Sequence, residues 1–330
     1  MGGRALKTVA TRRHTTAELE RAIDLARERL EARFPGIGAR PVQWFSAKET
    51  HGDLDLLVFP PDADAFARDL RNALTEDFNA AEIIRNGDVW SFNFDDLQVD
   101  LVVCRPEDRD IAIAWYSYND LSVLTGRIYR FWHLKWSPRG LFYPLFAEGT
   151  SVRLDDIFIS RDVSRIFAMM GYDYDRHRGG FSTMDDVFRY IASSEKFSRE
   201  CCDPKYMSND VKIRDNKRAN VQLFDEWLRG EAVPDFPRPT HRETIAMVER
   251  AFPESHLGAE IAKLEAEHRV RKEVAARFNG RHLIEEFGME GRAIGEAMAK
   301  FRNHFGDGYN DFILASDYAA ILSAFRNIVG

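Results

Sequence analysis

This sequence has few cysteines, no long apolar run and no excess of positive charge. Its 330 residues include three cysteines, of which Cys201 and Cys202 are adjacent. Three such residues cannot supply a disulfide framework or a tetrahedral zinc site with the usual spacing. No stretch approaches the ~20 apolar residues that cross a bilayer, and the polar N-terminus is unlike a signal peptide. We therefore expect a cytoplasmic protein with no membrane association.

Several familiar signatures of function are absent as well. The sequence has no glycine-rich dinucleotide fingerprint, no serine-hydrolase elbow and no repeat of fixed period. The formal net charge of -7 excludes a protein whose whole surface binds phosphates, but it allows a local basic groove. With 45% hydrophobic and 30% charged residues, the chain has the composition of a globular protein long enough for two domains.

Hydrophobic periodicity and turn residues predict an α+β fold with a mixed sheet. The predicted elements are a helix over residues 16–34, strands over 42–45 and 54–59, a helix over 62–75, strands over 82–85, 89–94 and 97–103, and a helical stretch over 110–136. The Asn86-Gly87 pair favours a hairpin between two of these strands. Beyond residue 184 the pattern is helical, except for a proline-rich connector over residues 234–239.

Three aspartates stand out on the predicted strands. Asp53 and Asp55 are two residues apart at the start of an apolar strand, so the pleat puts them on one face. Asp100 interrupts another apolar strand, where an ionised carboxylate needs a partner. Two-metal transfer of phosphoryl or nucleotidyl groups requires such a set of converging carboxylates. The alternative is that Asp53 is a turn residue, Asp55 lies on a solvated face and Asp100 pairs with an arginine.

The segment from Lys48 to Leu57, KETHGDLDLL, resembles the first catalytic motif of family X DNA polymerases, in which a Lys-Glu-Thr-x-Gly turn leads into Asp-x-Asp. Further similar segments follow in the family's order at residues 99–101, 115–122, 134–141 and 161–178. The resemblance covers residues 41–181. This chain departs from the family where Val42-Gln43 replaces its Gly-Ser, where Phe45-Ser46 replaces its paired arginines, and where Tyr116-Ser117 replaces the Thr-Gly of its sugar-contacting segment.

The resemblance implies a polymerase-beta-like nucleotidyltransferase palm, with a mixed sheet flanked by helices, over residues 1–110. A thumb-like subdomain over 111–183 and an all-helical domain over 184–330 complete the predicted organisation. Asp53, Asp55 and Asp100 are the predicted catalytic and metal-binding residues, with Mg²⁺ or Mn²⁺ as the cofactor because oxygen ligands suit these ions. His51 lacks a second His or Cys nearby and is not expected to bind metal.

An NTP or dNTP is the substrate that the resemblance implies. Ser46, Lys48 and Gly52 belong to the turn before the first aspartate, where a lysine and backbone donors can meet the triphosphate. Trp115 and Tyr116 are predicted to stack on the base or sugar. The alternative for the turn is an ordinary solvated loop.

The C-terminal segment 278–295 is similar to a turn-bearing helix pair in the tails of tRNA nucleotidyltransferases and related poly(A) polymerases, which implies RNA binding. The alternative is a helix-turn-helix with glycine C-caps at Gly280, Gly288 and Gly295. Basic residues that can contact phosphates occur in two clusters, although acids interleave the second: Lys212, Arg214, Lys217, Arg218, and Arg269, Arg271, Lys272, Arg277, Arg281.

The function predicted from the sequence is nucleotide addition to an RNA or DNA 3′ end, either template-independent or with a tRNA-like substrate. Two alternatives remain open at this stage. One is a nucleotidyltransferase that modifies a protein or small molecule, as in toxin–antitoxin or defence systems. The other is a non-catalytic nucleic-acid-binding relative. The oligomeric state has no signal in the sequence.

Overall fold

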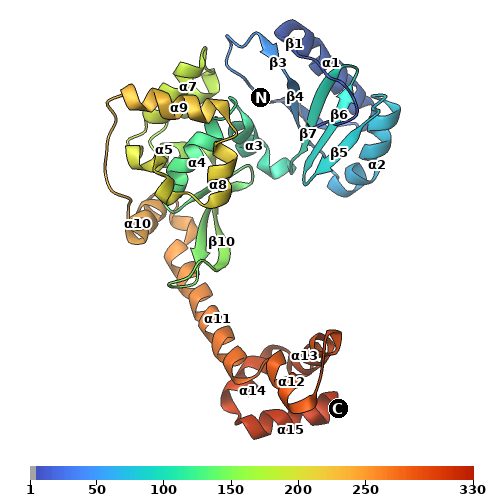
Figure 1. The fold of residues 1–330 in the computed structure, drawn as a ribbon, viewed down its shortest axis with the longest axis vertical. Helices are drawn as coiled ribbons and strands as arrows, with labels where there is room; N and C mark the ends of the chain where they lie inside the picture. Colours follow the sequence, from blue (N-terminus) through green and yellow to red (C-terminus); the bar gives the residue numbers. More distant parts are fainter. Residues whose placement is uncertain (1–4) are drawn as a thin grey trace. The chain divides into compact units, whose positions relative to one another are not determined.

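The computed structural model describes residues 5–330, which form two compact units (Figure 1). The first unit holds the chain up to Pro144 together with Phe158–His256. The second holds Leu145–Ile157 and Leu257–Gly330. The predicted divisions after residues 110 and 183 concern functional domains and stay predictions, because contacts divide the chain at other places.

A five-stranded mixed sheet lies in the first unit, in the order β2-β4-β7-β6-β5. β4 and β7 pair in parallel, and every other neighbouring pair in this sheet is antiparallel. The predicted α+β class with a mixed sheet is therefore confirmed. The strands are β2 (Gly38–Pro41), β4 (Asp53–Phe59), β5 (Ile83–Asn86), β6 (Val89–Phe94) and β7 (Leu97–Val103).

The two faces of this sheet are covered differently. Alternate residues such as Leu54, Leu56 and Val99 pack into a core with residues of helices α1 and α2. On the other face, Leu57, Phe59 and Val102 pack with Ala112 of helix α3. Because side chains alternate along a strand, Asp53 and Asp55 share the face of Leu57, at its open end. The sheet is thus apolar on both faces except where the aspartates lie.

Helices α1 (Thr16–Arg33) and α2 (Ala63–Glu76) begin where the sequence predicts them. A capping box of Thr15 and Glu18 starts α1, and the Asp62 side chain accepts the Ala65 backbone hydrogen bond at the start of α2. Such caps satisfy backbone N–H groups that have no partner inside the helix. Both helices flank the sheet in Figure 1.

Two sequence predictions about this region are wrong. The strand predicted over residues 42–45 lies earlier, at β2, because its partner residues on β4 are Leu56–Phe59 and the chain leaves the sheet after Val42. The stretch predicted to be helical over 110–136 forms α3 (Arg109–Tyr116), α4 (Leu121–Phe131) and strand β8 (Lys135–Ser137). Positive φ angles at Tyr118, Asn119 and His133 end the two helices.

The rest of the first unit is mainly helical and is tied to α4 by a buried ion-pair network. Arg127 of α4, 3% exposed, donates hydrogen bonds to Asp215 of α8 and Asp225 of α9. The other elements of this unit are β1 (His14–Thr15), β3 (Thr50–His51), η1 (Pro106–Asp108), α5 (Val163–Met169), α6 (Tyr174–Gly179), α7 (Met184–Ala192), η2 (Arg199–Cys202), η3 (Pro204–Tyr206), α8 (Asn209–Asp215), α9 (Ala219–Gly230), α10 (His241–Ala251) and η4 (Pro253–Ser255). The strands β9 (Gly140–Phe146) and β10 (Arg153–Ser160) each have residues assigned to both units.

The second unit has its own core around Phe278, Phe301 and Phe325, each almost completely buried. Its helices are α11 (Leu257–Arg277), α12 (Gly280–Phe287), α13 (Arg292–Phe305), η5 (Gly306–Gly308), α14 (Tyr309–Ala315) and α15 (Tyr318–Val329).

Of the three glycine C-caps considered for this segment, only Gly288 has that role, with φ +60° after α12. Gly280 begins α12, where a Cβ would meet Ile294, and Gly295 lies inside α13. Among residues 5–330, no helix combines the length and apolarity needed to cross a membrane.

Candidate functional site

Asp53, Asp55 and Asp100 lie together at the open end of the sheet. In the parallel pair of β4 and β7, Asp55 is directly opposite Asp100, and Asp53 is opposite Gln98. Neighbouring residues in register point to the same side of a sheet. The three carboxylates predicted from the sequence therefore lie on one face, at one end of the two strands.

Polar side chains of β7 and of its neighbour β6 continue this face. Gln98 donates a hydrogen bond of 2.9 Å from Nε2 to Oδ1 of Asp100, and the Ser91 hydroxyl also donates to Asp100. Ser91 is opposite Asp100 on β6. Amide and hydroxyl donors, rather than an arginine, thus orient the Asp100 carboxylate.

The carboxylates hinder one another's ionisation. The pKa of Asp55 is raised to about 7, first by the desolvation that surrounding protein atoms cause and then by the charges of Asp53 and Asp100. Asp55 nevertheless keeps an exposed surface, because it lies in an open pocket. Desolvation also raises the pKa of Asp100, with Asp53 adding to the rise and the two hydrogen bonds opposing it. A cation held among these groups would relieve the repulsion.

The charge of Lys48 interacts with those of Asp53 and Asp55. Desolvation lowers the pKa of its ammonium group, and the charges of Asp53 and Asp55 oppose this effect. Lys48, Asp53 and Asp55 line one pocket of about 80 Å³, which we call the carboxylate pocket. Its other lining residues are Leu19, Val42, Gln43, Trp44, His51, Leu54, Tyr116 and Asn119.

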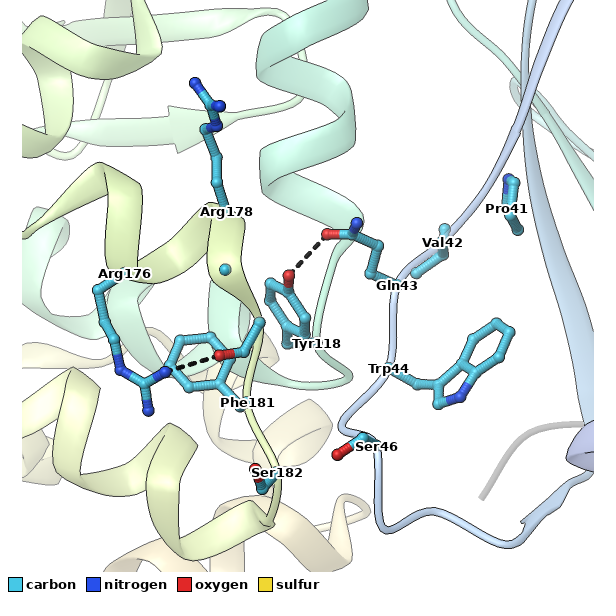
Figure 2. A pocket seen from close by; sticks show the side chains of 12 residues that line it. Pro41, Val42, Gln43, Trp44, Ser46, Tyr118, Arg176, Arg178, Phe181 and Ser182 are labelled. Carbon is cyan, nitrogen blue, oxygen red and sulfur yellow. Dashed lines mark hydrogen bonds between the residues drawn. The ribbon is translucent and has the colours of Figure 1, made fainter.

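A larger pocket of about 440 Å³ adjoins the carboxylate pocket, and the two share Val42, Gln43 and Trp44. We call it the arginine pocket, because Arg176 and Arg178 line it (Figure 2). Its remaining lining residues are Pro41, Ser46, Tyr118, Gly179, Gly180, Phe181 and Ser182.

The turn between α3 and α4 forms the boundary of both pockets. Tyr118 and Asn119 have φ angles of 62° and 59°, a left-handed conformation that is unfavourable for a bulky side chain. Tyr118 is held there by a backbone hydrogen bond of 2.7 Å to the Gln43 carbonyl and by a second of 2.7 Å from its hydroxyl to Gln43 Oε1. Strained backbone of this kind persists only where surrounding contacts fix it, and it is often found at functional sites.

The predicted nucleotide-binding residues do not all meet in one place. Lys48 and Tyr116 line the carboxylate pocket, whereas Ser46 lines the arginine pocket. Gly52 lies next to Asp53 in the chain but lines neither pocket. Trp115 packs edge-on against Tyr116, with ring centroids 4.7 Å apart, and also lines neither pocket.

His51 is buried and contacts neighbouring side chains through its ring. It is 1% exposed, its Nε2 is 3.1 Å from the Thr16 hydroxyl, and its ring packs edge-on against Trp44. Desolvation lowers the pKa of His51 to about 4, helped by the positive charges of Lys48 and Arg13. The ring is therefore neutral at physiological pH and is engaged by Thr16.

The aspartates have the right donor chemistry for a hard divalent cation, since each offers carboxylate oxygens. Among residues 5–330, no group of three or more His, Cys, Asp or Glu side chains has the arrangement of a finished metal site. The register of β4 and β7 places Asp55 directly opposite Asp100, and the charges of Asp53 and Asp100 add to the desolvation that raises the pKa of Asp55. In donor type and charge the residues fit Mg²⁺ or Mn²⁺, and ligation itself remains part of the proposal below.

A third pocket, of about 520 Å³, is lined by three of the four residues of the first basic cluster of the sequence. Arg214, Lys217 and Arg218 line it together with the acids Asp120 and Asp210. Arg218 pairs with Asp120, which also accepts a hydrogen bond from Asn220. Asp120 directly follows Asn119, which lines the carboxylate pocket, so consecutive residues of this turn line the two pockets.

Sequence reasoning missed Gln43, Tyr118 and Arg176 as site residues. A signal for the turn was present, because an asparagine between two apolar helical runs favours a left-handed backbone. Arg176 and Arg178 precede a Gly-Gly pair in the sequence, but nothing there indicates which pocket they line. Their position depends on long-range packing.

Comparison with known proteins gives no family. A scan against models of protein families finds no match for this chain, and a search of curated proteins finds no significant relative.

Proposed function

We propose that the chain is a metal-dependent nucleotidyltransferase of the polymerase-beta-like fold. It transfers a nucleotide from an NTP or dNTP to the 3′ hydroxyl of a nucleic acid and releases pyrophosphate. The observation that carries the proposal is the register of β4 and β7, in which Asp55 is opposite Asp100 and Asp53 is two residues away on the same face. The resemblance of residues 41–181 to family X DNA polymerases supports it.

The carboxylates have distinct parts in this reaction. Asp53, Asp55 and Asp100 would hold Mg²⁺ or Mn²⁺, which when bound lowers the pKa of the attacking hydroxyl and stabilises the leaving pyrophosphate. Asp100 accepts the hydroxyl proton, since desolvation raises its pKa and makes it a better base. The new bond joins the hydroxyl oxygen to the α-phosphorus, and the bond from that phosphorus to the bridging oxygen breaks.

Two features favour a triphosphate and a nucleic-acid acceptor. Lys48 offers a positive charge beside Asp53 and Asp55, where the charge of a phosphate chain needs compensation. Asn119 lines the carboxylate pocket and the next residue, Asp120, lines the pocket of Arg214, Lys217 and Arg218, so these cations are candidates for the backbone phosphates of an acceptor strand.

The test is incorporation of labelled NTPs and dNTPs into RNA, DNA and tRNA primers with Mg²⁺ or Mn²⁺. Asp53→Asn and Asp100→Asn are expected to abolish product ladders, whereas Asp24→Asn, an exposed position on α1, is expected to leave them unchanged. Absence of incorporation on every acceptor, with wild type and variants alike, would refute transfer to a nucleic acid.

A further inference from the structure

A segment before the first helix contacts the sheet face that the aspartates share. This segment, residues 5–13, has no regular secondary structure, and we call it the N-terminal strap. The Ala5 backbone N–H donates a hydrogen bond of 2.9 Å to Oε1 of Gln98, and Nε2 of Gln98 donates one of the same length to Oδ1 of Asp100. The strap is therefore joined to a predicted metal ligand through a single side chain.

We propose that the N-terminal strap is a positioning element of the carboxylate site, with Glu82 and Gln98 as the positioning residues that connect it to Asp100. This inference rests on the proposed function, because it assumes that Asp100 is a metal ligand. In this arrangement the strap touches neither metal nor substrate. It acts on Asp100 only through Gln98, and Glu82 acts only by holding the strap in place.

The strap fixes which end of the Gln98 amide faces Asp100. Gln98 is 1% exposed, and both ends of its amide group are engaged, the oxygen by Ala5 and the nitrogen by Asp100. If the amide were reversed, its NH2 group would face the Ala5 N–H and its oxygen would face a carboxylate. Two donors or two acceptors cannot form a hydrogen bond with each other. The strap therefore stabilises the orientation in which Gln98 donates to Asp100.

Glu82 holds the part of the strap that follows Ala5. Its carboxylate accepts hydrogen bonds of 2.8–3.0 Å from the backbone N–H groups of Lys7, Thr8 and Val9. Desolvation raises the pKa of Glu82, but these hydrogen bonds outweigh it and lower the pKa to about 2, so the carboxylate is ionised. Hydrogen bonds to an ionised acceptor are stronger than those between neutral groups. One side chain thus fixes three consecutive residues of the strap.

Glu82 is itself held by the same face of the sheet. Oδ1 of Asn93 accepts the backbone N–H groups of Ala81 and Glu82, at 2.8 and 2.9 Å. Asn93 of β6 is directly opposite Gln98 of β7, so the two side chains point to the same side. The sheet therefore holds the strap at two adjacent positions, through Asn93 and Glu82 at one and through Gln98 at the other.

Further contacts hold the other end of the strap where the two aspartate strands begin. The Arg12 N–H donates to the Asp96 carbonyl at 2.9 Å, and the Arg12 guanidinium pairs with the Asp96 carboxylate at 2.6 Å, directly before β7. Arg13 donates a hydrogen bond of 2.7 Å to the Thr50 carbonyl, shortly before β4. Because these contacts do not involve Glu82, its substitution should loosen residues 5–9 without detaching the whole strap.

The test measures Mn²⁺ binding by the full chain without nucleotide, using electron paramagnetic resonance to quantify free Mn²⁺. Gln98→Met, which nearly keeps the size of the side chain, is expected to weaken Mn²⁺ affinity about 10- to 100-fold, the usual effect of losing a residue that orients a metal ligand. Glu82→Gln leaves Gln98 in place, so a loss of about 10-fold is expected. The matched control is Glu31→Gln, because Glu31 also accepts a backbone N–H, that of Gly36 before β2, at 2.8 Å. It should bind Mn²⁺ as wild type does.

A double variant separates positioning from a general loss of stability. If the strap acts through Gln98, Glu82→Gln weakens Mn²⁺ binding in the wild-type background and has no further effect in the Gln98→Met background. Independent effects would instead multiply. Glu82→Asp, which keeps the negative charge, should recover part of the affinity lost in Glu82→Gln. Multiplying effects, or Mn²⁺ affinity that is unchanged in Glu82→Gln, would overturn the inference.

Failure of the proposed function would look different. A wild-type chain that binds Mn²⁺, loses affinity in Glu82→Gln and Gln98→Met, and transfers no nucleotide would support the role of the strap and refute the enzyme. A chain that transfers nucleotides and binds Mn²⁺ equally well in wild type and both variants would support the enzyme and refute the role of the strap. A wild-type chain that binds no Mn²⁺ would refute both.

Discussion

Replacing Asp55 with asparagine removes one of three interacting carboxylates while nearly keeping the size of the side chain. In metal-free solution at pH 8, we expect this change to stabilise the first unit. The reason is that Asp55 is ionised at this pH next to Asp53 and Asp100, in a place where desolvation already raises its pKa to about 7. Asparagine carries no charge and avoids both penalties.

The size of the effect follows from the pKa. A rise from 3.8 to about 7 corresponds to about 4 kcal/mol for a fully buried group. Asp55 keeps an exposed surface, so solvent screening reduces the expected gain to about 1 kcal/mol. For a unit of this size, that raises Tm by about 2–4 °C.

The sign of the pH dependence is fixed by the direction of the pKa shift. A carboxyl group whose pKa is higher in the folded state favours folding while it is protonated, and this contribution is lost as the pH rises from about 4 through about 7. Wild type should therefore lose stability relative to Asp55→Asn between pH 5 and pH 8. Thermal unfolding in EDTA at both pH values measures the difference.

Magnesium should reverse the order of stability. A ligand that binds only the folded state stabilises it by about 2.7 kcal/mol at 100 times its Kd. Excess Mg²⁺ is expected to raise the Tm of wild type at pH 8 and to raise that of Asp55→Asn much less, with Asp24→Asn as the charge-matched control. If Asp55→Asn and Asp24→Asn behave alike in both EDTA and Mg²⁺, the carboxylates neither repel one another nor bind a metal, and the reasoning is wrong.

Four further substitutions test the packing inside each of the two units. Arg127→Met removes one of the two arginines that pair with the buried Asp215 and leaves Arg214 in place, so about 1–3 kcal/mol should be lost in chemical denaturation. Gly140→Ala puts a Cβ at φ +143° and 2.9 Å from a backbone oxygen, so it should lower the free energy of unfolding by about 2 kcal/mol. In Gly126→Ala of α4, the new Cβ meets no atom within 4 Å, so this change should raise the free energy of unfolding by about 0.5–1 kcal/mol. Phe301→Ala, fully buried, should destabilise the second unit by about 3–5 kcal/mol and leave nucleotide binding by the first unit unchanged.

Local signals predicted most of the sheet and the helices beside it. The capping residues Thr15 and Asp62 and the period of the apolar residues place α1 and α2 within two residues of their observed ends. The hairpin at Asn86-Gly87 and the turn at Asp95-Asp96 also form. Information about these elements lies within a few neighbouring residues, which is why the sequence alone predicts them.

Elements defined by distant partners were predicted poorly. Residues 42–45 have the apolar character of a strand, but pairing with β4 ends at Pro41 and the next residues line pockets instead. His133 adopts a φ of 54°, and the Leu134 N–H donates a hydrogen bond to the Tyr129 carbonyl. Helix α4 therefore ends at Phe131, and Trp136 lies in β8. The same reason applies to the arginine pocket, whose two walls are more than 130 residues apart in the chain.

The end of the sheet that carries the aspartates, together with the turn beside it, gathers features that each oppose stability. Two carboxylates have raised pKa values there, a lysine is desolvated beside them, and the turn at Tyr118 and Asn119 has a left-handed backbone. Elsewhere the same sheet is packed with leucine, valine and phenylalanine, so an apolar edge was available to this fold. Unfavourable groups that collect at one place are best explained by a ligand that relieves them. A cation among the aspartates would offset their mutual repulsion, and an anion beside Lys48 would offset the desolvation of its ammonium group.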